Sequence, residues 1–214
     1  MIKKIIALTM LLMPLSMMAQ SNWELPDSKN VKTEKPKKAD KNVRTATNPK
    51  YGVGAVSLVN GKIEWDYTIS LPGQKADEIY AKVQSALEEL IQQPEQRDDS
   101  RLTAVNKSEH IVAAYLDEEL VFSRKAIARD FCHIRYTLIA TAKEGELALR
   151  LCRITYLYDV GRRTEKQYTA NELITDEEAM NATKTKFYPM PGKFRCHTID
   201  RKDEVFGFIE SRVK

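Results

Sequence analysis

Residues 63–71, IEWDYTISL, alternate between apolar and polar side chains. A period of two is typical of a β-strand that buries one face. Pro72-Gly73 follows directly and predicts the end of the strand. We therefore expect this strand to lie with one face on the core.

Residues 75–93, KADEIYAKVQSALEELIQQ, carry apolar side chains at helical spacing. Asp77 and Glu78 would occupy the first turn, where the helix dipole favours carboxylates. Pro94 predicts the end of the helix. The pattern predicts an amphipathic helix with one stripe on a sheet, formed by Ile79, Val83, Ala86, Leu87 and Leu90.

Two further strands are predicted at residues 101–106 and 110–122, joined by a short turn. The second contains the acidic run Asp117-Glu118-Glu119, where a β-bulge would fit. The run lacks the alternating ligand spacing of a calcium loop. We therefore interpret its charges as solvated.

A β-hairpin is predicted at residues 131–159, FCHIRYTLIATAKEGELALRLCRITYLYD, with Glu144-Gly145 as its turn. If Lys143 pairs with Glu146, one face is mostly apolar and should meet the helices. That face contains Cys132, Ile134, Tyr136, Leu138 and Ala140 with Leu149, Leu151, Arg153, Thr155 and Leu157. The other face is mixed and suits an open sheet surface; it contains His133, Arg135, Thr137 and Ile139 with Arg150, Cys152, Ile154 and Tyr156.

The C-terminal part is predicted to be helical in short pieces. Residues 168–186 favour two such pieces, with Thr175 or Asp176 as a cap for the second. Residues 184–204, KTKFYPMPGKFRCHTIDRKDE, contain two prolines and a glycine, which predict an ordered connector. A last helix then begins with Asp200 as N-cap and buries Val205, Phe206, Ile209 and Val213.

These elements predict an α+β fold. Its order is β-α-β-β-β-β-α, an antiparallel sheet of about five strands with two helices packed on one face.

The first 19 residues have the pattern of a signal peptide. Lys3 and Lys4 precede an apolar run of 14 residues, and Ala19 precedes the expected cut. Because a membrane span needs about 20 residues, an uncleaved anchor is the less favoured alternative. Met17 is large for its position, so the cut could shift. No cysteine precedes Cys132, so a lipoprotein is not expected, and no transmembrane segment follows.

Residues 20–50 predict a flexible basic tether, because they contain few large apolar side chains to bury. It is either a solvated spacer or an attachment to an anionic envelope surface. Residues 51–214 then form a single domain with 24 Lys/Arg against 26 Asp/Glu. A domain without excess positive charge lacks the basic field typical of nucleic-acid binding, so no nucleic-acid partner is predicted.

The cysteines and histidines give no recognisable catalytic or metal site. Cys132 and His133 adjoin on a strand and therefore point to opposite faces, as do Cys132 and Cys152 in the predicted register. Cys196-His197 supplies two ligands where zinc uses three or four. The chain has no GxSxG, HExxH, Walker or GxGxxG pattern. We predict no catalytic residue, no metal and no cofactor.

A basic, aromatic-edged binding surface is the candidate site. It would form if the open strand face met the closing segment, and would take an envelope protein, a peptide or an anionic glycan. The favoured interpretation of the individual arginines is that they pair with carboxylates and serve packing and solubility. The predicted surface comprises His133, Arg135, Arg150, Tyr156, Arg162, Arg163, Lys186, Lys193 and Arg195.

Two segments resemble a known family. GKIEWDYTISLPGQKADEIYAKV resembles the opening, and YTANELITDEEAMNATKTKFYPMPGKFRCHTIDRKDEVF the closing signature, of domain-of-unknown-function family 4468. The resemblance covers about residues 51–214. It implies a TATA-binding-protein-like (TBP-like) fold, a curved antiparallel sheet with helices on its convex side, and an exported protein of Gram-negative gut bacteria. No activity is assigned to the family.

The function predicted from these observations is an exported, non-enzymatic binding domain in the periplasm or cell envelope. The alternative is a hydrolase-type enzyme with a carboxylate or Cys–His site that the sequence does not reveal.

Overall fold

The computed structural model describes residues 43–124 and 129–214, which contain a six-stranded antiparallel sheet. Its strands are β3 (Trp65–Ser70), β4 (Arg101–Asn106), β5 (Ile111–Arg124), β6 (Arg129–Lys143), β7 (Glu146–Tyr158) and β8 (Lys166–Thr169). The order is β3-β7-β6-β5-β4, and β8 also pairs with β7. Two short strands, β1 (Leu58–Val59) and β2 (Lys62–Ile63), pair separately. The predicted α+β class is confirmed, although the sequence did not predict β1, β2 and β8.

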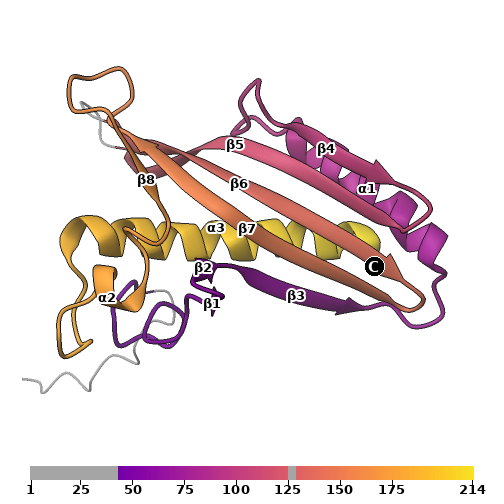
Figure 1. The fold of residues 1–214 in the computed structure, drawn as a ribbon, viewed down its shortest axis with the longest axis horizontal. Coiled ribbons are helices and arrows are strands. Elements are labelled where there is room, and N and C mark those ends of the chain that lie inside the picture. Colours follow the sequence, from indigo (N-terminus) through magenta and orange to yellow (C-terminus); the bar gives the residue numbers. More distant parts are fainter. Residues whose placement is uncertain (1–42, 125–128) are drawn as a thin grey trace, which may run out of the picture. The chain divides into compact units, whose positions relative to one another are not determined.

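Two helices cover the same face of the sheet (Figure 1). They are α1 (Ala76–Ile91) and α3 (Pro189–Val213), and they pack on the sheet and on each other. The predicted stripe of α1 is buried, with Ile79, Val83 and Leu87 wholly inaccessible. The side of the sheet away from α1 and α3 is called the open face below.

Among the described residues, no helix is both long and apolar enough to span a membrane.

The last helix begins at Pro189, eleven residues before the predicted start at Asp200. The predicted connector is therefore wrong. Pro189 and Pro191 lie in the first turn, where backbone N–H groups have no partner within the helix, so proline is tolerated there. Gly192 lies against Phe187: a Cβ at Gly192 would come within 2.3 Å of the Phe187 Cβ atom.

In the described part of the C-terminal region, one short helix precedes α3. Helix α2 (Asp176–Ala179) is capped by Thr175, whose Oγ1 accepts a hydrogen bond from the Glu178 backbone N–H. The other predicted helical piece is instead β8 and a turn.

The β6–β7 hairpin has the predicted register only near its turn. Pairs from Lys143–Glu146 to Thr137–Cys152 agree, but the next pair is Arg135–Thr155. One extra residue of β7 therefore forms a β-bulge. Beyond it, the faces of β7 are opposite to those predicted.

The acidic run of β5 also differs from the prediction. Asp117 and Glu118 lie in regular pairing with β6, and the register of β5 shifts between Val121 and Ser123 instead. Neither carboxylate is solvated, since Asp117 is 0% and Glu118 1% exposed.

Part of the predicted tether packs on the domain. The Asp200 carboxylate of α3 accepts hydrogen bonds from Arg44 Nε (2.8 Å) and Tyr51 Oη (2.7 Å), and Lys50 Nζ lies 2.6 Å from it. Ala46 is buried. The folded domain therefore begins before Tyr51.

Candidate functional site on the open sheet face

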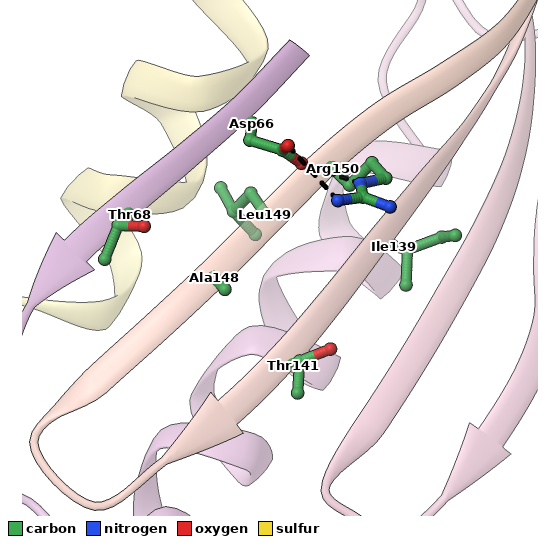
Figure 2. A pocket seen from close by; sticks show the side chains of 7 residues that line it. All are labelled: Asp66, Thr68, Ile139, Thr141, Ala148, Leu149 and Arg150. Carbon is green, nitrogen blue, oxygen red and sulfur yellow. Dashed lines mark hydrogen bonds and ion pairs between the residues drawn. The ribbon is translucent and has the colours of Figure 1, made fainter. Parts of the chain in front are cut away.

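The open face carries an ion pair between β3 and β7. Arg150 Nε donates to Asp66 Oδ1 at 2.7 Å and Arg150 Nη2 to Asp66 Oδ2 at 3.2 Å, while Glu64 lies 3.7 Å from Nη1. Figure 2 looks onto this pair, with helices behind the strands. The Arg150 side chain is 50% exposed. It is therefore exposed to solvent on the open face.

A hollow of about 480 Å³ lies beside this ion pair. It is lined by residues of β3, β6 and β7. The lining residues are Asp66, Thr68, Ile139, Thr141, Ala148, Leu149 and Arg150 (Figure 2).

Arg135 has a structural partner on this face. Its Nε donates to Asp117 Oδ2 at 3.0 Å, and Arg97 Nε lies 3.4 Å from Asp117 Oδ1. A buried carboxylate needs such partners because burial without them is costly. Removal of Arg135 would leave one cation beside Asp117, so Arg135 serves both the core and the surface.

His133 is on the predicted face but is only 4% exposed. Its Nε2 lies 3.2 Å from Arg97 Nη1, which can only donate. Burial, and then the charge of Arg97, lowers the pKa of His133. The ring is therefore neutral near pH 7 and adds no cation to the face.

Arg153 is the residue that the sequence prediction misplaced most. It is in the bulge of β7, at a left-handed φ of 57°, which costs a non-glycine residue roughly 1–2 kcal/mol. The bulge directs Arg153 to the open face, where it is exposed. Counting the strand pairs outward from the turn, with Lys143 opposite Glu146, places Arg153 on the wrong face, because the register changes after Cys152.

A second hollow of about 500 Å³ adjoins the first at Ile139 and Arg150. It lies over the bulge, at the edge of β7 between the segments paired with β3 and with β8. Its lining residues are Lys62, Ile63, Glu64, Ile139, Arg150, Cys152, Arg153, Ile154, Thr155, Thr169, Ala170 and Asn171.

Tyr156 is not on the open face, and its predicted place is wrong. The bulge turns it toward α3, where it is 1% exposed and its Oη lies 2.8 Å from Thr198 Oγ1. Ile154 is likewise in the core. The structure therefore removes Tyr156 from the predicted surface, and Ile154 is not on the open face where it was predicted.

Lys193 and Arg195 belong to α3, behind the sheet. Lys193 Nζ bonds Asp130 Oδ2 at 2.8 Å and lies over the Phe122 ring. Arg195 is fully buried and donates to the Tyr51 and Ile174 carbonyls at 2.7 and 2.6 Å, to the Gly52 carbonyl, and to Asp176. Arg195 therefore joins the N-terminal segment, α2 and α3.

The remaining predicted cations lie in loops. Arg162 and Arg163 are exposed between β7 and β8, and Arg162 pairs with Asp159 at 3.3 Å. Lys186 is exposed between α2 and α3. The predicted concavity, in which the closing segment meets the open face, is not formed by these residues.

The three thiols are free and buried. Burial raises the pKa of Cys132, of Cys152 and of Cys196, the last to about 11, so each stays protonated near neutral pH. In the described ranges, no three His, Cys, Asp or Glu side chains are grouped to hold a metal ion. The recorded hydrogen bonds of the His133 and His197 rings are with Arg97 and Arg44.

The fold and site define an α+β domain whose antiparallel sheet is covered on one face and accessible on the other. Residues 65–157 match the model of a family described as a domain of unknown function (DUF4468) with TBP-like fold. The family resemblance and the TBP-like fold predicted from the sequence are thereby confirmed. No curated protein matches the chain significantly.

Two solved structures are similar to the chain. A DUF4468 family protein from Bacteroides ovatus ATCC 8483 is 29% identical, with a TM-score of 0.71 over 77% of this chain and 93% of that one. A TBP-like protein from Parabacteroides distasonis ATCC 8503 is 18% identical, with a TM-score of 0.61 over 74% of this chain and 96% of that one. The second likeness concerns the fold alone.

Proposed function

We propose that the protein is an exported, non-enzymatic binding domain that contacts its partner through the open face. The observation that carries this proposal is the accessibility of Arg150 beside two hollows, on a sheet face that α1 and α3 leave uncovered. A sheet of this kind usually buries one face and solvates the other. The uncovered face here has arginines and shallow hollows, which support recognition of a ligand.

The partner is an anionic glycan, a peptide or an envelope protein. Guanidinium groups bind carboxylates through paired hydrogen bonds and also stack on aromatic rings. Arg101 lies 5.2 Å from the centroid of the Tyr115 ring, which is paired with Thr137 through β5 and β6. The face therefore combines cationic and aromatic groups.

The proposed location of the protein is the periplasm or the cell envelope. It is supported by Lys3 and Lys4 followed by a short apolar run ending before Gln20. These residues lie outside the described part of the chain, so the sequence alone supports this part of the proposal.

One experiment tests both the export of the protein and its binding role. The whole chain is expressed with its own N-terminus in a Gram-negative host, and the protein of the periplasmic fraction is sequenced from its N-terminus. We expect it to begin at or near Gln20. An uncleaved chain retained in the cytoplasm would contradict export.

The recovered protein is then applied to arrays of anionic glycans and peptides. Arg150→Ala should lose the binding seen with the wild type while changing stability by no more than about 1 kcal/mol, because its ion pair is exposed. Lys107→Ala, in the exposed β4–β5 turn, should bind as the wild type does. If Arg150→Ala keeps the wild-type binding profile, or the wild type binds no probe, the proposal fails.

A further inference from the structure

The hollow over the β7 bulge has an excess of positive charge. Lys62, Arg150 and Arg153 line it, against the single carboxylate of Glu64. Glu64 also lies near Arg150, at 3.7 Å from Nη1. Because Asp66 and Glu64 both lie against Arg150, the remaining excess of positive charge comes from Lys62 and Arg153, and it favours an anionic ligand.

Two of these cations have no partner among the residues that the structure describes. Within residues 43–124 and 129–214, neither the Lys62 ammonium group nor the Arg153 guanidinium makes a hydrogen bond or an ion pair. Arg150, by contrast, is held by Asp66. Lys62 and Arg153 therefore keep their hydrogen-bond donors available to a ligand.

Arg153 reaches the hollow through a strained backbone conformation. In a regular strand, the residue after Cys152 would point toward the helices, as Leu151 does. The bulge and the left-handed backbone of Arg153 bring it to the open face instead. Bulges commonly redirect a side chain beside a binding site.

The rest of the lining suits a ligand that also carries hydroxyl groups. Thr155 offers a hydroxyl, and the Thr169 hydroxyl, which donates to Glu172 Oε2 at 2.7 Å, can still accept a hydrogen bond. Asn171 keeps its amide oxygen available, since its Nδ2 donates to the Gly61 carbonyl at 2.7 Å. Ile139 adds apolar surface. A volume of about 500 Å³ lies within the usual range for small-molecule sites.

We propose that this hollow binds a hydroxyl-bearing carboxylate of the size of a hexuronic acid, with Arg153 and Lys62 as its charge partners. The inference rests on the proposed function, because it assigns a ligand class to one part of the open face.

The test uses D-glucuronate as the probe and D-glucose as its neutral counterpart. The ¹⁵N-labelled mature chain is titrated with each, and backbone amide shifts are followed. Glucuronate should shift the amides of residues 152–155 and 169–171, whereas glucose should shift them far less. Equal shifts with both sugars would overturn the role of the carboxylate.

Two substitutions of Arg153 separate binding from folding. Arg153→Gln should weaken glucuronate binding roughly ten- to a hundredfold, the loss expected for a charge-assisted hydrogen bond, while Lys107→Gln should bind as the wild type does. Arg153→Gly should weaken binding similarly but leave the melting temperature unchanged or higher, because glycine accepts the left-handed backbone.

The possible failures are distinguishable. If Arg153→Gly or Arg153→Gln binds glucuronate as tightly as the wild type, or glucuronate shifts no amide near the bulge, this site is wrong. Array binding that still depends on Arg150 would then leave the proposed function intact. Loss of that dependence as well would overturn both.

Discussion

At the scale of single residues, buried charges explain why basic residues in the sequence were poor guides to the surface. Arg195 is fully buried and pairs with Asp176 at 2.7 Å, and Glu118, 1% exposed, pairs with Arg201 at 2.8 Å. Buried charges persist only with such partners. A fully buried cation such as Arg195 cannot also contact a ligand, and composition does not separate buried cations from exposed ones.

His197 gives a prediction at this scale. Burial, and then the nearby Arg44 charge, lowers the pKa of His197 to about 4. The charge of Lys193 also lowers this pKa, whereas the carboxylates of Asp200 and Asp130 raise it and offset part of the shift. The unfolded chain binds this proton below a pH of about 6.5, but the folded chain does not. The free energy of unfolding should therefore decrease as pH falls from about 6.5 to about 4.

His197→Gln should reduce that decrease, measured as urea midpoints across the same range. The pKa of Asp200 is lowered too, so its contribution is lost only at lower pH as its carboxylate becomes protonated. Identical pH dependence of the variant and the wild type would show that His197 has no such role.

At the scale of elements, α3 shows that the structure favoured by proline and glycine depends on their position within a helix. Proline and glycine near Pro189 predict a loop when read alone, but in the first turn of a helix proline is accepted. Packing of the helix start against Phe187 then requires glycine at position 192. The prolines and the glycine that predicted a connector therefore mark the first turn of α3 instead.

The two glycines of α3 should respond oppositely to alanine. Gly192→Ala places a Cβ 2.3 Å from the Phe187 Cβ atom, and such overpacking costs about 1–3 kcal/mol. Gly207 is exposed and a Cβ there meets no atom within 4 Å. Gly207→Ala should therefore stabilise the protein by about 0.5–1 kcal/mol. Urea denaturation measures both, and changes of the same sign would contradict this account.

At the scale of the whole molecule, the folded domain extends into the segment predicted to be a tether. Arg44 and Lys50 converge on Asp200, and Arg195 reaches the carbonyls of Tyr51 and Gly52. Residues 43–52 therefore fasten the middle of α3. They are polar in sequence because their contacts are ion pairs and hydrogen bonds.

A truncated chain tests this boundary. A protein beginning at Tyr51 should have a free energy of unfolding about 1–2 kcal/mol below that of one beginning at Asn42, because it lacks partly exposed ion pairs and the buried Ala46. Chemical denaturation compares the two. Equal stability would place the start of the domain at Tyr51.

The sequence by itself determined the features that depend on local pattern. Alternation and helical spacing identified β3 and α1, and the Glu144-Gly145 turn fixed the register as far as Thr137–Cys152. The same pattern correctly placed Leu138 and Leu151 in the core and Arg150 in solvent. Each of these follows from side chains within a few residues of one another.

Only the tertiary structure decided the bulge at Arg153, the start of α3 and the contacts of residues 43–52. A bulge reverses the face on which every later side chain of the strand lies. Arg153 therefore lies on the open face, and Tyr156 lies in the core. The extra residue lies where β7 exchanges β3 for β8 as its neighbour. Such long-range pairing has no signature in the local sequence, because the free energies that select it come from distant residues.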